Sequence, residues 1–128
     1  MGNLLIYNIQ DAGKLRKIQT LAIRLGFRVR AVKPEEFSRP LGALVNLPGA
    51  ETLAEGDGTP FFDEMLVLCN VSTQAFQAFL SGLRTQKTPV ALKAMLTQHN
   101  VGWSSSALHK AILEEHQAMQ QGKQSPHQ

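Results

Sequence analysis

The sequence predicts a small α/β domain in which a four-stranded parallel sheet carries helices on both faces. Short apolar runs alternate along the chain with longer segments whose apolar side chains recur every three or four residues. The runs are typical of buried strands, and the longer segments are typical of amphipathic helices. Strand–helix alternation of this kind is typical of parallel sheets with right-handed crossovers. The length of 128 residues suits a single domain.

The first half of the chain supplies two of these strands. Residues 4–7 (LLIY) form an apolar run suited to a strand that is buried on both faces. Asp11 offers an N-cap for a following helix, and Gly26 ends that helix. Residues 27–32 (FRVRAV) alternate between apolar and polar side chains, as half-exposed edge strands do.

The second half supplies the other two strands. Residues 65–69 (MLVLC) are again uniformly apolar, and Ser72 caps the helix that follows them. Residues 90–96 predict the fourth strand, and Ser104 or Ser105 caps a last helix. We recognise no internal repeat between the two halves.

The strand patterns also predict the order of the sheet. The two uniformly apolar strands belong at its centre and residues 27–32 at an edge, which gives the order 2-1-3-4 of a small doubly wound, flavodoxin-like sheet. Such sheets bind ligands beyond the C-terminal strand ends, where the order switches between the first and third strands. Asn8 and Asn70 directly follow those strands, so we expect them to border a crevice with Lys33 and Thr97.

The chain is expected to form one domain over residues 1–120, followed by a polar, disordered tail over residues 121–128. Residues 39–60 hold four of the ten glycines and three of the six prolines, but they also contain several leucines. We expect this stretch to be a packed excursion, and connections of such length in small domains are usually functional or mobile.

The composition indicates a soluble protein of a reducing compartment. Cys69 is the only cysteine, so the chain has no internal disulfide. No apolar run approaches the ~18 residues that span a bilayer, and the N-terminus lacks the basic region of a signal peptide. We therefore expect a cytoplasmic protein with no membrane partner.

The motifs of common cofactor and catalytic sites are missing from the sequence. The turn at residues 8–13 has one glycine where a dinucleotide-binding loop needs three. His109 and His116 lie two helical turns (~10 Å) apart, too far to share one metal ion. We therefore expect no cofactor, no metal site and no paired acid and base.

The change from apolar to polar residues within 90–103 marks the strongest candidate site. Lys93 would meet an anionic group, Thr97 and Asn100 would form hydrogen bonds, and Trp103 would supply apolar contact, all beside the long excursion. Architectural roles remain open as well. Lys93 can lie along a strand edge with its amine in water, and Trp103 can staple the last helix to the sheet.

A second candidate surface is basic. Residues 12–34 carry seven basic side chains and no acidic one, whereas residues 35–64 carry seven acidic side chains and one basic one. Nucleic acid could bind a patch within residues 14–33, although no exposed aromatic residue or RNA-binding motif accompanies it. The residues of this patch would be Arg16, Lys17, Arg24, Arg28 and Arg30.

Four stretches of the chain resemble one protein family. They are LLIYN at 4–8, RPLGALVNLPG at 39–49, FFDEMLVLCNV at 61–71 and LKAMLTQHNVGWSSSALHKAILEEH at 92–116. The most specific pattern within them consists of Lys93, Leu96, Thr97, Asn100 and Trp103. From residue 3 to about residue 119 the chain resembles the Domain of Unknown Function 3783, a family of small uncharacterised bacterial proteins. The resemblance implies a compact bacterial cytosolic domain, and it implies no activity, cofactor or catalytic residue.

We predict a non-enzymatic binding or regulatory module whose partner is another protein or a small anionic ligand. The lack of a recognisable nucleophile–base or acid–base set is the reason. Two alternatives are kept. One is an enzyme that acts on a small anionic substrate at the C-terminal strand ends with Lys93 or His99. The other is a nucleic-acid-binding protein that uses the basic patch.

Overall fold

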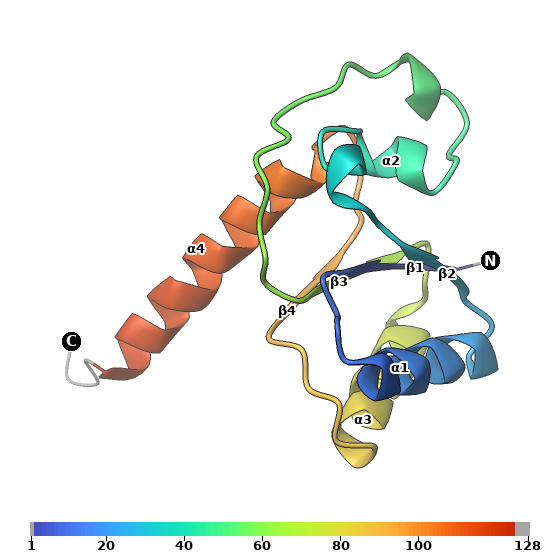
Figure 1. The fold of residues 1–128 in the computed structure, drawn as a ribbon, viewed down its shortest axis with the longest axis vertical. Coiled ribbons are helices and arrows are strands. Elements are labelled where there is room, and N and C mark those ends of the chain that lie inside the picture. Colours follow the sequence, from blue (N-terminus) through green and yellow to red (C-terminus); the bar gives the residue numbers. More distant parts are fainter. Residues whose placement is uncertain (1, 125–128) are drawn as a thin grey trace.

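A four-stranded sheet between two layers of helices forms the body of the protein (Figure 1). The computed structural model describes residues 2–124. The strands are β1 (Asn3–Tyr7), β2 (Arg28–Ala31), β3 (Met65–Cys69) and β4 (Leu92–Met95). The α-helices are α1 (Ala12–Arg24), α2 (Leu41–Leu44), α3 (Thr73–Thr85) and α4 (Ser105–Gln124), and two 3-10 turns are η1 (Pro34–Glu36) and η2 (Ala50–Thr52). The predicted order β2-β1-β3-β4 is confirmed.

The prediction of an all-parallel, doubly wound sheet is wrong, because the central strands β1 and β3 run antiparallel. The outer pairs, β1 with β2 and β3 with β4, are parallel as predicted. The reason lies between β2 and β3. A parallel third strand would need a crossover that returns the chain along the whole sheet. The longest helix in this connection is α2, with four residues or ~6 Å, so β3 starts at the end where β2 stops.

The antiparallel centre removes the expected crevice between the first and third strands. The C-terminal ends of β1 and β2 lie at one end of the sheet, and those of β3 and β4 lie at the other. Asn8 and Lys33 are therefore at one end of the sheet, while Asn70 and Thr97 are at the opposite end. The switch-point rule fails here because it applies to strands that point the same way.

Each face of the sheet has its own apolar core. On one face, α1 and α3 cover Leu4, Ile6 and Leu66. On the other face, α2 and α4 cover the side chains that alternate with these, among them Leu5 and Val67. The predicted placement of helices on both faces is confirmed, and it explains why β1 and β3 are apolar on both sides.

The two halves of the chain are structural copies of each other, although no repeat was expected from the sequence. β1 and β3 have five residues each, α1 and α3 thirteen each, and β2 and β4 four each. Asparagines with positive φ, Asn8 (63°) and Asn70 (57°), follow the first strand of each half. Equivalent turns then follow the second strand. Lys33 N–H donates to the Glu36 side chain in one, and Thr97 N–H donates to the Asn100 side chain in the other.

An approximate twofold axis relates these halves, because residues at their contact pair with their own counterparts. Leu5 at the middle of β1 lies opposite Val67 at the middle of β3. Pro40 and Ser104, which precede α2 and α4, form a bridge with each other. Two crossed hydrogen bonds flank that bridge, from Gly42 N–H to Val101 O at 2.9 Å and from Ser106 N–H to Phe37 O at 3.4 Å.

The largest difference between the halves is the last helix. α2 ends after one turn, whereas α4 continues for 20 residues to Gln124. The expected disordered tail therefore begins in a helix, and its residues 125–128 lie outside the described residues. The excursion 39–60 contributes Leu41 and Leu44 to the core on the α4 face of the sheet.

Candidate functional site

The residues predicted from the stretch 90–103 lie in three separate places. Side chains of β4 point alternately to the two faces, so Lys93 lies on the α3 face, whereas Leu92 and Ala94 face α4. Trp103 packs on the α4 face, with its ring 5.3 Å from that of His99. The structure therefore does not bring Lys93 and Trp103 together.

The polar residues of that stretch build a turn. Asn100 Oδ1 accepts from Thr97 N–H at 2.8 Å, and Asn100 Nδ2 donates to Met95 O at 3.2 Å. Asn100 is buried, so its side chain is committed to the backbone. Thr97 borders a small hollow of about 240 Å³ together with Asn70. That pair lies together as predicted, but at the end of the sheet away from Asn8.

Asn8 holds the end of the long connection in place. Its side-chain amide donates to Phe61 O and Asp63 O, each at 3.0 Å. Asp63 in turn bonds His109 of α4 at 2.8 Å, and the His109 ring stacks on Phe61. Sequence reasoning missed this contact because Asp63 and His109 are far apart in the chain. It fastens the connection to α4.

The basic residues divide between the two faces of the sheet. Arg16, Lys17 and Arg24 are exposed on α1. Val29 of β2 points to the α1 face, so its neighbours Arg28 and Arg30 point to the other face. The five side chains predicted as one patch therefore do not share a surface, and nucleic-acid binding stays a prediction for the α1 residues alone.

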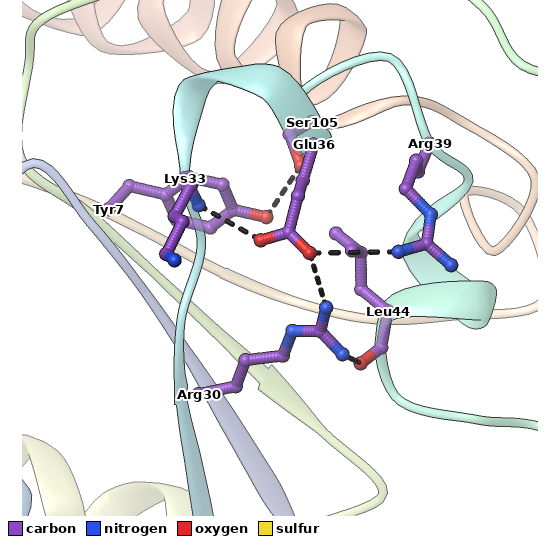
Figure 2. Close-up of polar contacts among 7 residues, drawn as sticks. All are labelled: Tyr7, Arg30, Lys33, Glu36, Arg39, Leu44 and Ser105. Carbon is purple, nitrogen blue, oxygen red and sulfur yellow. Dashed lines mark hydrogen bonds and ion pairs between the residues drawn. The ribbon is translucent and has the colours of Figure 1, made fainter.

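Arg30 belongs to an ion-pair cluster around Glu36 (Figure 2). The Glu36 carboxylate accepts from Lys33 N–H and from Arg30, and it lies 3.6 Å from the Arg39 guanidinium. Arg30 also donates to Leu44 O at 3.1 Å. Partial burial raises the pKa of Glu36, but these hydrogen bonds and charges outweigh it, so that the pKa lies below its ordinary value. Arg30 thus ties β2 to η1 and α2.

Figure 2 also shows Tyr7 of β1 pointing at Ser105 at the start of α4. Their hydroxyls are 2.7 Å apart, and both residues are fully buried. Burial raises the pKa of Tyr7 above its ordinary value, so the phenol stays neutral. This buried bond joins the two halves and has an architectural role.

A hollow that combines apolar and charged side chains lies between α3 and β4, and we call it the α3–β4 groove. Its volume is about 590 Å³, which is within the range of ligand sites. Apolar side chains dominate its lining, and every charged residue in that lining is basic. The lining residues are Leu80, Leu83, Arg84, Lys87, Pro89, Val90, Ala91 and Lys93.

The three cations of the groove come from different elements. Arg84 is in the last turn of α3, Lys87 follows that helix, and Lys93 is in β4. The Lys93 amine donates to Val90 O, and partial burial lowers its pKa from the ordinary value. Lys87 is exposed and has a φ of 59°, a conformation that lysine rarely adopts.

Comparison of the two halves shows that the fold does not require these charges. The position equivalent to Arg84 in α1 is Ile23, and Lys93 of β4 corresponds to Val29 of β2, since each pairs with the second residue of its neighbouring strand. Lys87 corresponds to Gly26, which also follows the helix with positive φ. Sequence reasoning found Lys93 but missed Arg84 and Lys87, which stand out once they are seen to line the groove with Lys93.

Metal binding, thiol chemistry and membrane spanning have no supporting feature in the described part of the chain. Residues 2–124 contain no group of three or more His, Cys, Asp or Glu side chains that could hold a metal ion. Cys69 is buried in β3, and burial raises its thiol pKa to about 12. No helix within the described residues is both long and apolar enough to cross a membrane.

Comparison with known proteins assigns the second half of the chain to a family. Residues 64–119 match the model of the Domain of unknown function (DUF3783). The segment of residues 64–119 belongs to the DUF3783 family. The match starts one residue before β3 and ends within α4, so the DUF3783 segment coincides with the second structural copy and contains the whole α3–β4 groove. Searches of curated proteins and of solved structures give no match.

The resemblance inferred from the sequence is confirmed for this DUF3783 segment. The stretches at 4–8 and 39–49, on which that inference also rested, lie before the matched residues. The family description assigns no activity, so functional inference depends on the groove itself.

Proposed function

We propose that the protein is a non-enzymatic binding module that holds an anionic, partly apolar ligand or partner segment in the α3–β4 groove. The observation that carries this proposal is the chemistry of the groove, whose lining combines three basic side chains with five apolar residues. An apolar lining with a few well-placed polar groups is typical of ligand sites.

The comparison of the halves supports a functional role for these cations. Arg84, Lys87 and Lys93 replace the uncharged side chains of the first half, and they bring like charges close together. Like charges repel, and Lys87 adds backbone strain. The fold of the first half forms without them, so they are best explained by an anion that they bind.

The test compares two triple variants that lose the same charge. The groove variant carries Arg84→Gln, Lys87→Gly and Lys93→Met, and the control variant carries Arg16→Gln, Lys17→Met and Arg24→Gln on the exposed face of α1. Probes are dodecanoate, dodecyl phosphate and the glutamate–valine octapeptide Glu-Thr-Val-Thr-Glu-Thr-Val-Thr, which carries glutamate and valine on the same side of an extended strand. Binding is measured by calorimetric titration.

At least one probe should bind the native protein, and the groove variant should weaken that binding tenfold or more. The control variant should retain it within about twofold, because its charges lie outside the groove. Equal losses in the two variants would indicate attraction by net charge alone and would reject the groove. The absence of binding by every probe would reject the proposed function.

An enzyme acting on a small anionic substrate is the alternative, and the lowered pKa of Lys93 favours it. A binding module returns its ligand chemically unchanged. Mass spectrometry of each probe after prolonged incubation with the native protein therefore distinguishes the two functions. A product that forms with the native protein but not with the Lys93→Met variant would show that the protein is an enzyme that depends on Lys93.

A further inference from the structure

We propose that the occupant of the α3–β4 groove is an extended acidic peptide segment of a partner protein, which adds to the sheet as a strand beside β4. This inference rests on the proposed function and specifies the partner. It is carried by three features: the edge position of β4, the groove beside that edge and the overhang of α4.

The backbone of β4 offers an edge for strand addition. β4 is the last strand of the sheet. Leu96 N–H donates to Leu68 O of β3 at 2.8 Å. Because the backbone N–H and C=O groups of successive residues face alternate sides of a strand, those of Ala94 also point to β3. The backbone N–H and C=O groups of Lys93 and Met95 point away from β3, towards the free edge. Met95 O accepts from Asn100, which leaves the outward backbone of Lys93 as the centre of the edge.

The groove borders this same edge. Val90 and Ala91, which precede β4, and Lys93 within it line the groove together with Leu80 and Leu83 of α3. In a strand laid along β4, alternate side chains would point towards α3. Those side chains would enter the groove, and the backbone would complete the ladder.

The last helix covers the other face of β4. α4 then runs past the sheet on the β4 side (Figure 1). Residues 117–120 are exposed, and Met119 keeps 67 % of its surface in solvent. An added strand would therefore lie between α3 and α4, with helices on both faces as in the central strands.

The opposite edge of the sheet lacks this arrangement. β2 has α1 on one face, but the short α2 leaves Arg28 and Arg30 on the other. Arg30 is held by Glu36 and Leu44 O across that face. A strand added beside β2 would therefore have a helix on one face only, because α2 ends after one turn. Strand addition is thus expected at β4 and not at β2.

The charges of the groove determine the chemistry of the partner strand. Arg84, Lys87 and Lys93 line the groove, and no acidic residue is part of its lining. Every second side chain of the added strand would face the groove. Glutamate or aspartate at some of these positions would reach the cations, and apolar residues at the others would contact Leu80 and Leu83. A partner segment with acidic and apolar residues on one side of a strand meets both requirements.

The test selects octapeptides from a displayed random library on the native full-length protein, with the groove variant as counter-selection. The best peptide is then synthesised in two forms. One form is N-methylated at the odd-numbered backbone nitrogens, and the other is N-methylated at the even-numbered ones. The affinity of each form is measured by fluorescence anisotropy, and hydrogen exchange is followed at the Lys93 amide. Dodecanoate serves as the small-molecule competitor.

Acidic, partly apolar peptides should be enriched on the native protein. One N-methylated form should bind tenfold or more weakly while the other is little affected, because only one set of amides faces β4. The Lys93 amide should exchange more slowly in the complex. Enrichment of basic peptides, or equal affinity of both N-methylated forms, would overturn strand addition.

The outcomes also separate this inference from the proposed function. If no peptide is enriched but dodecanoate binds the native protein and not the groove variant, the partner strand is wrong and the binding module stands. If no peptide binds and neither dodecanoate nor dodecyl phosphate binds, both proposals fail.

Discussion

Replacement of Lys87 by glycine should make the protein more stable and, at the same time, a poorer binder. Lys87 adopts a φ of 59°, which costs a residue with a β-carbon about 1–2 kcal/mol. Glycine avoids this strain but loses about 0.5–1 kcal/mol more on folding through its freer unfolded chain. The midpoints of these two ranges give a net gain of about 0.75 kcal/mol. Relief of repulsion between Lys87 and the other groove cations adds to it.

The matched control is the equivalent glycine in the first half. Gly26 has a φ of 87°, and a β-carbon there would meet nothing within 4 Å. Gly26→Ala should therefore destabilise the protein by about the same 0.75 kcal/mol, through backbone conformation alone. Urea unfolding followed by the fluorescence of Trp103, the single tryptophan, measures both changes.

Three results would refute this reasoning. Unchanged or lower stability of Lys87→Gly would show that the position carries no strain. Higher stability with unchanged affinity for the groove ligand would show that Lys87 has no part in binding. A change in the free energy of unfolding that has the same sign for both substitutions would show that Lys87 and Gly26 do not occupy equivalent positions.

Three further predictions concern the architecture that positions the groove. Tyr7→Phe leaves the buried Ser105 hydroxyl without its partner at 2.7 Å, so the free energy of unfolding should fall by about 1–3 kcal/mol in urea titrations; the additional Ser105→Ala should recover part of the loss, and full additivity would contradict the bond. Gly82→Val should destabilise the protein by about 1–3 kcal/mol, because a β-carbon there would lie 2.6 Å from Leu21 Cδ1 between α1 and α3; a neutral effect in thermal unfolding would refute this close packing. Burial raises the pKa of Cys69 to about 12, so its unfolded state, with a pKa of about 8.5, releases the proton first, and stability should fall as pH rises above about 8.5 towards 12. Urea titrations between pH 7.5 and 9.5 should show a shallower decline for Cys69→Ala, and identical slopes would contradict the prediction.

Local patterns in the sequence predicted much of the fold. Asp11 and Ser72 cap α1 and α3 as expected, with side-chain oxygens that accept backbone N–H groups. The uniformly apolar residues 4–7 and 65–69 correctly predicted central strands. These features depend on neighbouring residues and on burial, which periodicity reports directly.

Strand direction could not be predicted in the same way. An apolar run such as 65–69 is buried on both faces whether it runs parallel or antiparallel to its neighbour. Direction depends on where the preceding connection leaves the chain. The expected excursion over residues 39–60 contains one α-helix of a single turn, which is too short to carry the chain back along the sheet. The error in strand direction placed Asn8 and Asn70 at one site.

The candidate site depended on contacts between distant parts of the chain. Lys93 was found because a lysine within an apolar strand is conspicuous. Arg84 and Lys87 look like ordinary surface charges at the end of a helix, and only their proximity to Lys93 across the groove distinguishes them. The polar residues at 97 and 100 were conspicuous too, but a turn that bonds its own backbone explains them.

The most direct test of the central claim is a map of backbone amide chemical-shift changes in the native protein. Dodecanoate or the glutamate–valine octapeptide, whichever binds, is titrated into the protein. The account predicts that the largest changes fall between residues 80 and 95, at the end of α3 and along β4, and that α1 is unaffected. Changes centred on α1, on β2 or on the turn at Thr97 and Asn100 would contradict it.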